Sequence, residues 1–230
     1  MAEQMYSMMI RDKCVRVFPA ETAHCPVIYL HTHDSEGAAV WQAVKNMGAR
    51  DFNLVAVSGL RWNDEMSPWA SAPIRKNDAP FGGEADAYLE VLLKDIMPQA
   101  ERLLLGEPCW RGLCGYSLAG LFAVYALYKS AAFSRMASVS GSLWYPKVQA
   151  FVESRPLCVQ PECLYFSLGD KECRTRNPQL REVQTATENL VAHFKQQGIA
   201  VTFVLHPGNH FQDTTMRTAQ AIQALLADAV

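Results

Sequence analysis

A serine between small residues is the feature of this sequence that points most directly to chemistry. Ser117 lies within GYSLAG, Gly115–Gly120, after an apolar run of strand length and before a long apolar helical pattern. A G-x-S-x-G nucleophile elbow requires this strand-turn-helix context. The sharp turn needs very small residues two positions before and after the serine, and Gly115 and Ala119 stand there. The pattern predicts Ser117 as a nucleophile; the alternative is a turn serine or a helix N-cap.

A serine nucleophile needs a general base, and the chain offers one near its end. A strand-length run is followed by HPGNH, His206–His210, in which a Pro-Gly pair enforces a loop. The partners in such enzymes follow the order serine, acid, histidine, so we expect His210 to be the base. His206 is the competitor, but a histidine at a strand end more often has a structural role. The Pro-Gly pair also disfavours a helical pair of histidine ligands, and no metal site is expected here.

The acid that orients the histidine should follow the preceding strand. There the segment YFSLGDKE, Tyr165–Glu172, offers Asp170 and Glu172 in a turn that Gly169 opens. The acid would accept a hydrogen bond from the second ring nitrogen of the base and stabilise the imidazolium. The residues alone leave Asp170 and Glu172 both open, and carboxylates in exposed turns are also common without any role.

The elements that must position these residues alternate along the chain. Their continuous apolar runs suit parallel strands that are buried on both faces. Strands joined by helices imply right-handed crossovers and a mostly parallel sheet with helices on both faces, in one three-layer α/β domain over residues 1–230. Strands are expected at Cys25–His31, Asn53–Ser58, Trp110–Tyr116, Arg135–Ser140, Glu162–Leu168 and Ala200–Leu205. Helices are expected at Gly37–Met47, Glu84–Leu105 (bent or broken near Pro98), Leu118–Ser130, Pro178–Gln197 and from Asp213 or Thr214 toward Ala229.

Composition narrows the class of protein. Of 230 residues, 50% are hydrophobic and 19% are charged, which is typical of a compact enzyme rather than a disordered chain. A formal charge of −2 provides no basic field for nucleic acid. Charged residues interrupt Met1–Ala20, so we expect no signal peptide or membrane span, and a cytoplasmic location. The seven cysteines fit reduced thiols, and Cys158, Cys163 and Cys173 lack the spacing of a zinc site.

With these segments in view, the chain resembles the esterase family of α/β-hydrolases that includes the enterobactin-type ferric siderophore esterases, and more distantly the esterase D and mycolyltransferase group. The resemblance covers nearly the whole chain. Its motifs are GYSLAG at 115–120, FSRMASVSGSLWYP at 133–146, G-x-x-E at 169–172, the turn ending in His210, and RWNDEMSPW at 61–69.

The resemblance implies an α/β-hydrolase fold with Ser117 as nucleophile, His210 as base and Glu172 as the favoured acid, although some family members use only a Ser-His dyad. It also implies an oxyanion hole made of two backbone N–H groups, those of Leu118 and Asp34. His33 then stands where the family usually has glycine, and His31 or His33 is a candidate contact to substrate.

Two further residues are candidates for the substrate site. Arg61 could anchor a carboxylate or a polar acyl group, because its planar fork suits bidentate recognition; the alternative is an ion pair with Asp64 or Glu65. Trp144 follows the strand after the nucleophile helix and could form an aromatic wall of the pocket, or pack in the core.

The sequence as a whole predicts a serine esterase that acts on a small-molecule ester without cofactor or metal, as a monomer or homodimer, with little or no lid insertion. A thioesterase or peptidase on the same fold is one alternative. A binding protein that retained the fold and lost the chemistry is another.

Overall fold

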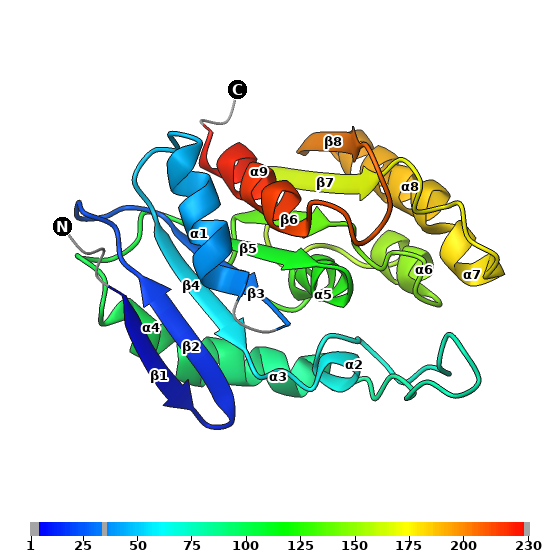
Figure 1. Ribbon diagram of the computed structural model, residues 1–230, viewed down its shortest axis with the longest axis horizontal. Coiled ribbons are helices and arrows are strands. Elements are labelled where there is room, and N and C mark those ends of the chain that lie inside the picture. The colour runs from blue at the N-terminus through cyan, green and yellow to red at the C-terminus, as the bar shows by residue number, and fades with distance from the viewer. Residues whose placement is uncertain (1–4, 34–35, 228–230) are drawn as a thin grey trace.

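A mostly parallel sheet forms the centre of the molecule. The computed structural model describes residues 5–33 and 36–227, and within them the chain forms an eight-stranded sheet of order β1-β2-β4-β3-β5-β6-β7-β8 (Figure 1). The pairs from β4 to β8 are parallel, whereas β1 pairs with β2, and β2 with β4, in antiparallel fashion. The strands are β1 (Tyr6–Ile10), β2 (Lys13–Phe18), β3 (Val27–His31), β4 (Asn53–Ser58), β5 (Arg111–Tyr116), β6 (Arg135–Val139), β7 (Cys163–Gly169) and β8 (Ala200–His206).

Helices connect the strands and cover both faces of the sheet. They are α1 (Glu36–Asn46), α2 (Trp62–Glu65), α3 (Ala85–Val91), the π-helical η1 (Leu92–Ile96), α4 (Met97–Glu101), α5 (Leu118–Ala126), α6 (Val148–Glu153), α7 (Pro178–Arg181), α8 (Val183–Gln196) and α9 (Thr214–Leu226). None of the helices within the described residues is long and apolar enough to cross a membrane.

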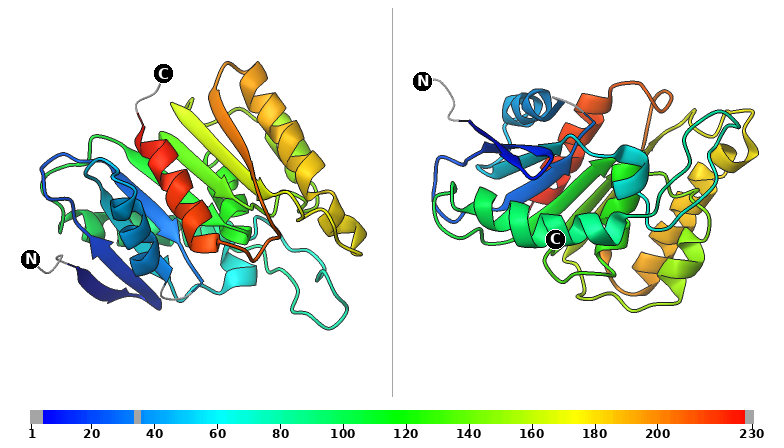
Figure 2. Two further views of the ribbon diagram at one scale, coloured as in Figure 1. Left: turned by 45° about the horizontal axis from the view of Figure 1, so that its top comes forward. Right: turned by 90° about the horizontal axis from the view of Figure 1, so that it is seen from below.

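Alternate residues of the strands enter two separate hydrophobic cores. In β3, Val27 and Tyr29 pack in the core on the side of α3, α5 and α8, whereas Ile28 and Leu30 pack on the side of α1 and α9. Successive side chains of a strand point to opposite faces, so a strand buried on both faces must be apolar throughout. Figure 2 shows the resulting three layers. The predicted α/β class and its mostly parallel sheet are confirmed.

The antiparallel hairpin of β1 and β2 is absent from the sequence-based prediction. Its strands are short, and successive residues alternate between more and less buried along much of their length. Such alternation is typical of strands at the edge of a sheet, unlike the continuous apolar runs that identified the central strands.

The long helix predicted over Glu84–Leu105 is interrupted before Pro98. The structure divides it into α3, the π-helical η1 and α4. Proline has no N–H to donate and its ring crowds the preceding turn, so the regular hydrogen-bond ladder cannot run through it. The helix predicted over Pro178–Gln197 is likewise divided into α7 and α8.

The carboxyl ends of the parallel strands meet at one edge, where the loops that carry chemistry are found. Between β6 and β7 the described chain forms one short helix, α6. A longer loop, residues 66–84 between α2 and α3, extends along this edge (Figure 1).

Candidate active site

The turn between β5 and α5 holds Ser117 in a strained conformation. Its backbone has φ 59° and ψ −121°, a region that residues other than glycine rarely adopt. A Cβ atom on Gly115 would lie 2.3 Å from the carbonyl oxygen of Ala119, so only glycine lets helix and strand approach this closely. Ala119 itself is fully buried, and the turn therefore accommodates the methyl group that replaces the consensus glycine.

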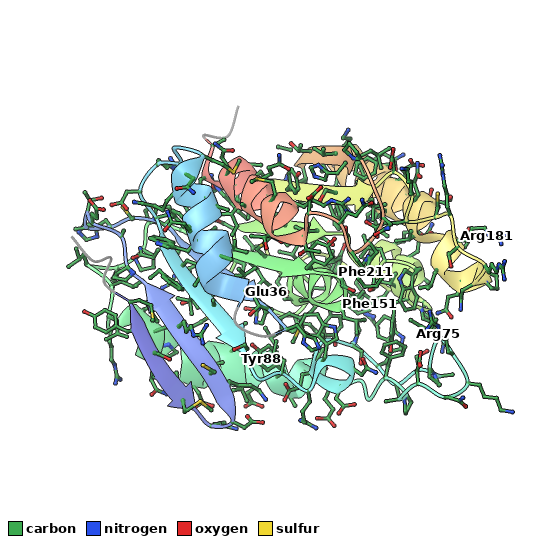
Figure 3. All side chains as sticks on the ribbon, in the orientation of Figure 1. Glu36, Arg75, Tyr88, Phe151, Arg181 and Phe211 are labelled. Carbon is green, nitrogen blue, oxygen red and sulfur yellow. The ribbon has the colours of Figure 1, made fainter. Side chains whose placement is uncertain are left out.

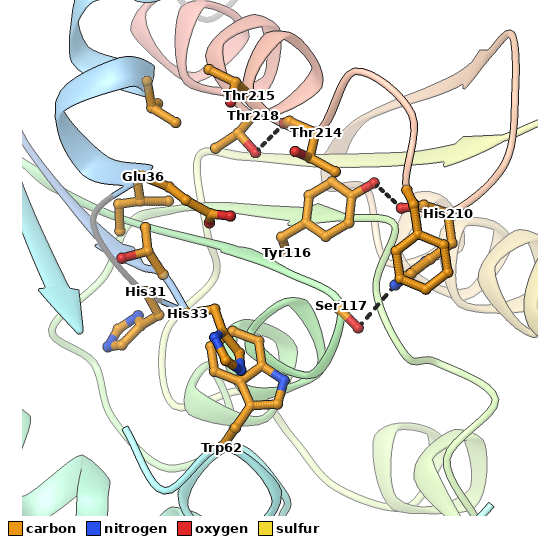
Figure 4. A pocket seen from close by; sticks show the side chains of 14 residues that line it. His31, His33, Glu36, Trp62, Tyr116, Ser117, His210, Thr214, Thr215 and Thr218 are labelled. Atoms are coloured by element: carbon orange, nitrogen blue, oxygen red, sulfur yellow. Dashed lines mark hydrogen bonds between the residues drawn. The ribbon is translucent and has the colours of Figure 1, made fainter. Parts of the chain in front are cut away.

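The structure brings the serine, the histidine and one carboxylate into a single chain of contacts. Ser117 Oγ lies 3.1 Å from His210 Nε2, a contact that a dashed line marks in Figure 4. His210 Nδ1 lies 2.7 Å from Glu172 Oε2. Neutral imidazole has one donor and one acceptor nitrogen, so a proton on Nδ1 would leave Nε2 free to accept the serine proton. Both distances are within hydrogen-bond reach, as a nucleophile, a general base and an acid that orients the base would require.

Glu172 is almost fully buried, with 3% of its side chain exposed. Burial opposes its ionisation, but hydrogen bonds from His210, the Ser140 hydroxyl and the Gly169 N–H outweigh this effect and hold its pKa below the usual value. Ser140 Oγ and the Gly169 N–H each lie 2.6 Å from Oε1. Oε2 remains available to His210, and the carboxylate is thereby held in its charged form.

The two alternatives weighed from the sequence have other partners. Asp170 accepts a hydrogen bond from the backbone N–H of Gly208 at 2.8 Å and so supports the turn before His210. His206 lies 3.4 Å from the hydroxyl of Tyr165, and its pKa is lowered by burial and by the nearby Arg217. Both residues shape the loop rather than contact Ser117.

Two residues that sequence reasoning missed hold the His210 loop. Arg217, which is 1% exposed, donates to the carbonyl oxygens of Pro207 and Asn209, and its Nη1 lies 3.5 Å from Glu172 Oε1. The Tyr116 hydroxyl donates to the carbonyl oxygen of His210 at 2.7 Å (Figure 4). An arginine on the mostly apolar buried face of α9 is the signal in the sequence that could have identified Arg217.

One predicted oxyanion donor can be placed and the other cannot. Leu118 is the first residue of α5, and its N–H is among the four that have no acceptor within a helix. Leu118 lines a surface pocket together with Ser117. Asp34 lies outside the described residues.

Two grooves meet at Ser117 and His210. The first, here called the α1–α9 groove, has a volume of about 320 Å³ and is lined by His33, Glu36, Trp62, Tyr116, Phe211 and Thr214, among others. The second, here called the loop groove, has a similar volume and is lined by Ile74, Arg75, Asp78, Trp144, Leu180 and Val183. Phe211 is 84% exposed and lies at the junction, with Glu36 on one side and Arg75 on the other (Figure 3).

Of the predicted substrate residues, two line the grooves and one does not. His33 and Trp144 line the grooves beside Ser117. Arg61 does not: it makes ion pairs with Asp64 and Glu65, as the alternative interpretation expected. It also pairs with Glu84, 23 positions further along the chain, which no local pattern could reveal.

His31, the other histidine considered for substrate contact, lies in the core. It is 1% exposed, and its ring packs edge-on against Tyr88 and Phe122. Burial lowers its pKa to about 3, so the ring is neutral in the folded protein at ordinary pH.

Comparison with known proteins supports the fold. No family model matches the chain. Over 148 residues it is 28% identical to the uncharacterized protein YbbA of Bacillus subtilis, a match that covers 63% of this chain and 59% of that relative's length.

Solved structures with the same fold include serine hydrolases and siderophore hydrolases. An IroE-like serine hydrolase from Shewanella oneidensis has a TM-score of 0.77 at 16% identity, over 97% of this chain and 79% of that one. The siderophore hydrolase EstA from Aspergillus nidulans has a TM-score of 0.76 at 18% identity, over 98% and 95%. The enterobactin hydrolase IroE, in complex with DFP, has a TM-score of 0.69 at 22% identity, over 98% and 95%. The α/β-hydrolase fold implied by the sequence resemblance is confirmed.

Proposed function

We propose that this chain, which has the fold of the siderophore hydrolases and related serine hydrolases, is a serine esterase. Its substrates would be small-molecule carboxylic esters. The proposal rests mainly on one observation, the chain of contacts from Ser117 through His210 to Glu172 at a strained turn. Such strain persists only where the surrounding structure imposes it, and it is concentrated at functional sites.

In the proposed first step, Ser117 Oγ attacks the ester carbonyl carbon while His210 Nε2 takes the hydroxyl proton. The carbonyl oxygen becomes an oxyanion, which the N–H of Leu118 stabilises at the positive end of α5. The bond to the alcohol oxygen then breaks, and His210 gives the proton to that oxygen. An acyl group remains on Ser117.

Water completes the cycle. His210 takes a proton from a water molecule that attacks the acyl carbon, and returns it to Ser117 Oγ as the carboxylic acid leaves. Glu172 keeps its charge throughout and stabilises the imidazolium that forms in each half-reaction. Each oxyanion donor contributes on the order of 10²-fold or more to the rate.

The grooves support a substrate with two arms. Because two grooves meet at the nucleophile, the acyl and alcohol parts of an ester can occupy separate spaces. Siderophore hydrolysis is the activity named for several proteins of this fold, and siderophore-type esters belong to the class proposed here.

Hydrolysis of p-nitrophenyl acetate tests the proposal. We expect turnover by the wild-type protein, a loss of up to about 10⁶-fold in kcat for Ser117→Ala or His210→Ala, and about 10⁴-fold for Glu172→Gln. Ser154→Ala and His193→Ala are matched controls away from the grooves and should leave the rate unchanged. Equal rates in wild type and Ser117→Ala would contradict the proposal.

A further inference from the structure

Glu36 places a carboxylate in the α1–α9 groove. It is the first residue of α1, and Figure 4 shows its side chain directed into the space in front of Tyr116. Within the described residues its carboxylate makes no ion pair and no hydrogen bond with a side chain. The mechanism proposed above does not use it.

The rest of the groove has few charges and many rings. Trp62, Tyr116 and Phe211 line it, and of the described lining residues none is lysine or arginine. Its other titratable groups are His31, His33, His210 and the Tyr116 phenol. The loop groove differs, because Arg75 and Asp78 bring both charges to its wall.

This combination is suited to a cation. An aromatic ring has a negative face that attracts ammonium groups, and a carboxylate adds a full opposite charge. An anionic or strongly polar arm would meet the Glu36 charge without a compensating cation. We propose that the α1–α9 groove binds an ester arm that carries a protonated amine or a quaternary ammonium group, with Glu36 as the specificity-determining residue. This proposal rests on the proposed esterase function, since the arm belongs to the ester that Ser117 cleaves.

Glu36 could also act only on the stability of α1, without binding substrate. An acidic side chain in the first turn of a helix interacts favourably with the helix dipole. That role affects the stability of α1 but does not distinguish a cationic ester from a neutral one of the same shape. Substrate discrimination therefore separates the two roles.

Pairs of isosteric esters provide the kinetic test. Butyrylcholine and 3,3-dimethylbutyl butyrate differ only in the alcohol arm, where the first has a positively charged nitrogen and the second a neutral carbon atom. The p-nitrophenyl esters of 4-(trimethylammonio)butyrate and 5,5-dimethylhexanoate differ in the same way in the acyl arm. The preference is the kcat/KM for the cationic ester divided by that for the neutral ester. For one of the two pairs, we expect this ratio to be about tenfold higher in wild type than in Glu36→Gln. No difference in preference between wild type and Glu36→Gln for either pair would overturn the proposal.

A matched control separates the groove from overall charge. Glu107→Gln removes one exposed carboxylate before β5, at the opposite edge of the sheet, and should leave both preferences as in wild type. An equal loss of preference in Glu107→Gln and Glu36→Gln would assign the effect to net charge and overturn the proposal.

Equilibrium binding keeps the test independent of turnover. Phenyltrimethylammonium should bind Ser117→Ala with a Kd about tenfold lower than that of Ser117→Ala/Glu36→Gln. If no ester is hydrolysed but this difference is found, the esterase function fails and the cation site stands. If esters are hydrolysed but the cation binds both variants equally, the cation site fails alone.

Discussion

At the scale of single residues, hydrogen bonds hold the buried carboxylate of Glu172 in its charged form. Two donors hold Oε1, the imidazole of His210 contacts Oε2, and Arg217 lies close behind. An ionised carboxylate at this position can stabilise an imidazolium, whereas a protonated one could not. Ser140 and Arg217 are therefore positioning residues for the proposed chemistry.

Ser140→Ala should make the protein less stable in a pH-dependent way. The pKa of Glu172 in the folded state lies below its usual value, so its contribution to stability is present above the unfolded pKa of about 4.3 and is lost as pH falls through the folded pKa. Loss of the hydroxyl should lower the free energy of unfolding by about 1.5–3 kcal/mol at neutral pH. Urea unfolding from about pH 7 down to about pH 3 should show this difference shrink. A constant difference over that range would contradict the ionised Glu172.

Arg217→Met should reduce kcat more than it raises KM. The substitution keeps an apolar stem of similar length but removes the donors to Pro207 and Asn209, which shape the loop before and around His210. A displacement of about 1 Å in a catalytic group can cost about 10²-fold in rate, and we expect a loss of that order in kcat. Steady-state kinetics with p-nitrophenyl acetate measure it, and a loss confined to KM would be evidence against this positioning role.

The site residues that could be predicted from the sequence are those that stand in short local motifs. Ser117 stands in a motif of six residues, and His210 follows a Pro-Gly turn, so both could be proposed from short segments. Asp170 and Glu172 share one turn but have different contacts, because Asp170 accepts from the N–H of Gly208, 38 positions away, whereas Glu172 contacts His210. The ion pair of Arg61 with Glu84 and the contacts of Arg217 also join residues that are far apart in the sequence, so no local pattern predicts them.

At the scale of elements, the elbow brings β5 and α5 so close together that position 115 has no room for a side chain. A Cβ atom on Gly115 would lie 2.3 Å from the backbone of Ala119, and the backbone of Ser117 has a positive φ of 59°. The same closeness presents the serine hydroxyl at the helix N-terminus.

Gly115→Ala should therefore destabilise the fold and reduce activity together. The added methyl group would lie 2.3 Å from backbone atoms of Ala119, and overpacking of this kind costs about 1–3 kcal/mol, occasionally more. Ala119→Gly is the matched variant: it restores the consensus glycine, costs about 1 kcal/mol of helix propensity and should retain kcat. Urea unfolding and p-nitrophenyl acetate turnover measure both. An active Gly115→Ala protein of wild-type stability would contradict this account of the turn.

The central elements were predictable because burial on both faces leaves strands continuously apolar. The hairpin of β1 and β2 was not, since strands of five and six residues with alternating burial give a weak pattern. The division of the predicted helix into α3, η1 and α4 follows from Pro98, whose effect could be expected although its π-helical form could not.

At the scale of the whole molecule, three segments far apart in the sequence enclose the site. The loop 66–84, the segment around α7 and the connection from β8 to α9 each contribute walls. A hydrogen bond from Asn177 to the carbonyl oxygen of Ile74 joins the first two across the loop groove. Substrate size is therefore set by how these segments pack together.

Narrowing the loop groove should discriminate between esters by length. Leu180 lines this groove from α7, and Leu180→Trp would fill part of its volume of about 320 Å³. We expect kcat/KM for p-nitrophenyl octanoate to fall relative to p-nitrophenyl acetate by about tenfold or more, while the acetate rate stays near that of wild type. Parallel losses for both esters would indicate a general disturbance rather than a filled groove.

The most direct measurement of the central claim is the position of a covalent adduct. The protein would be incubated with a fluorophosphonate, and the modified residue identified by mass spectrometry of its peptides. We predict one adduct, on Ser117, that is absent in Ser117→Ala and forms far more slowly in His210→Ala, because the histidine must take the serine proton. An adduct on Ser142, whose hydroxyl lies 3.4 Å from that of Ser117, or equal labelling of wild type and His210→Ala, would contradict Ser117 as the nucleophile activated by His210.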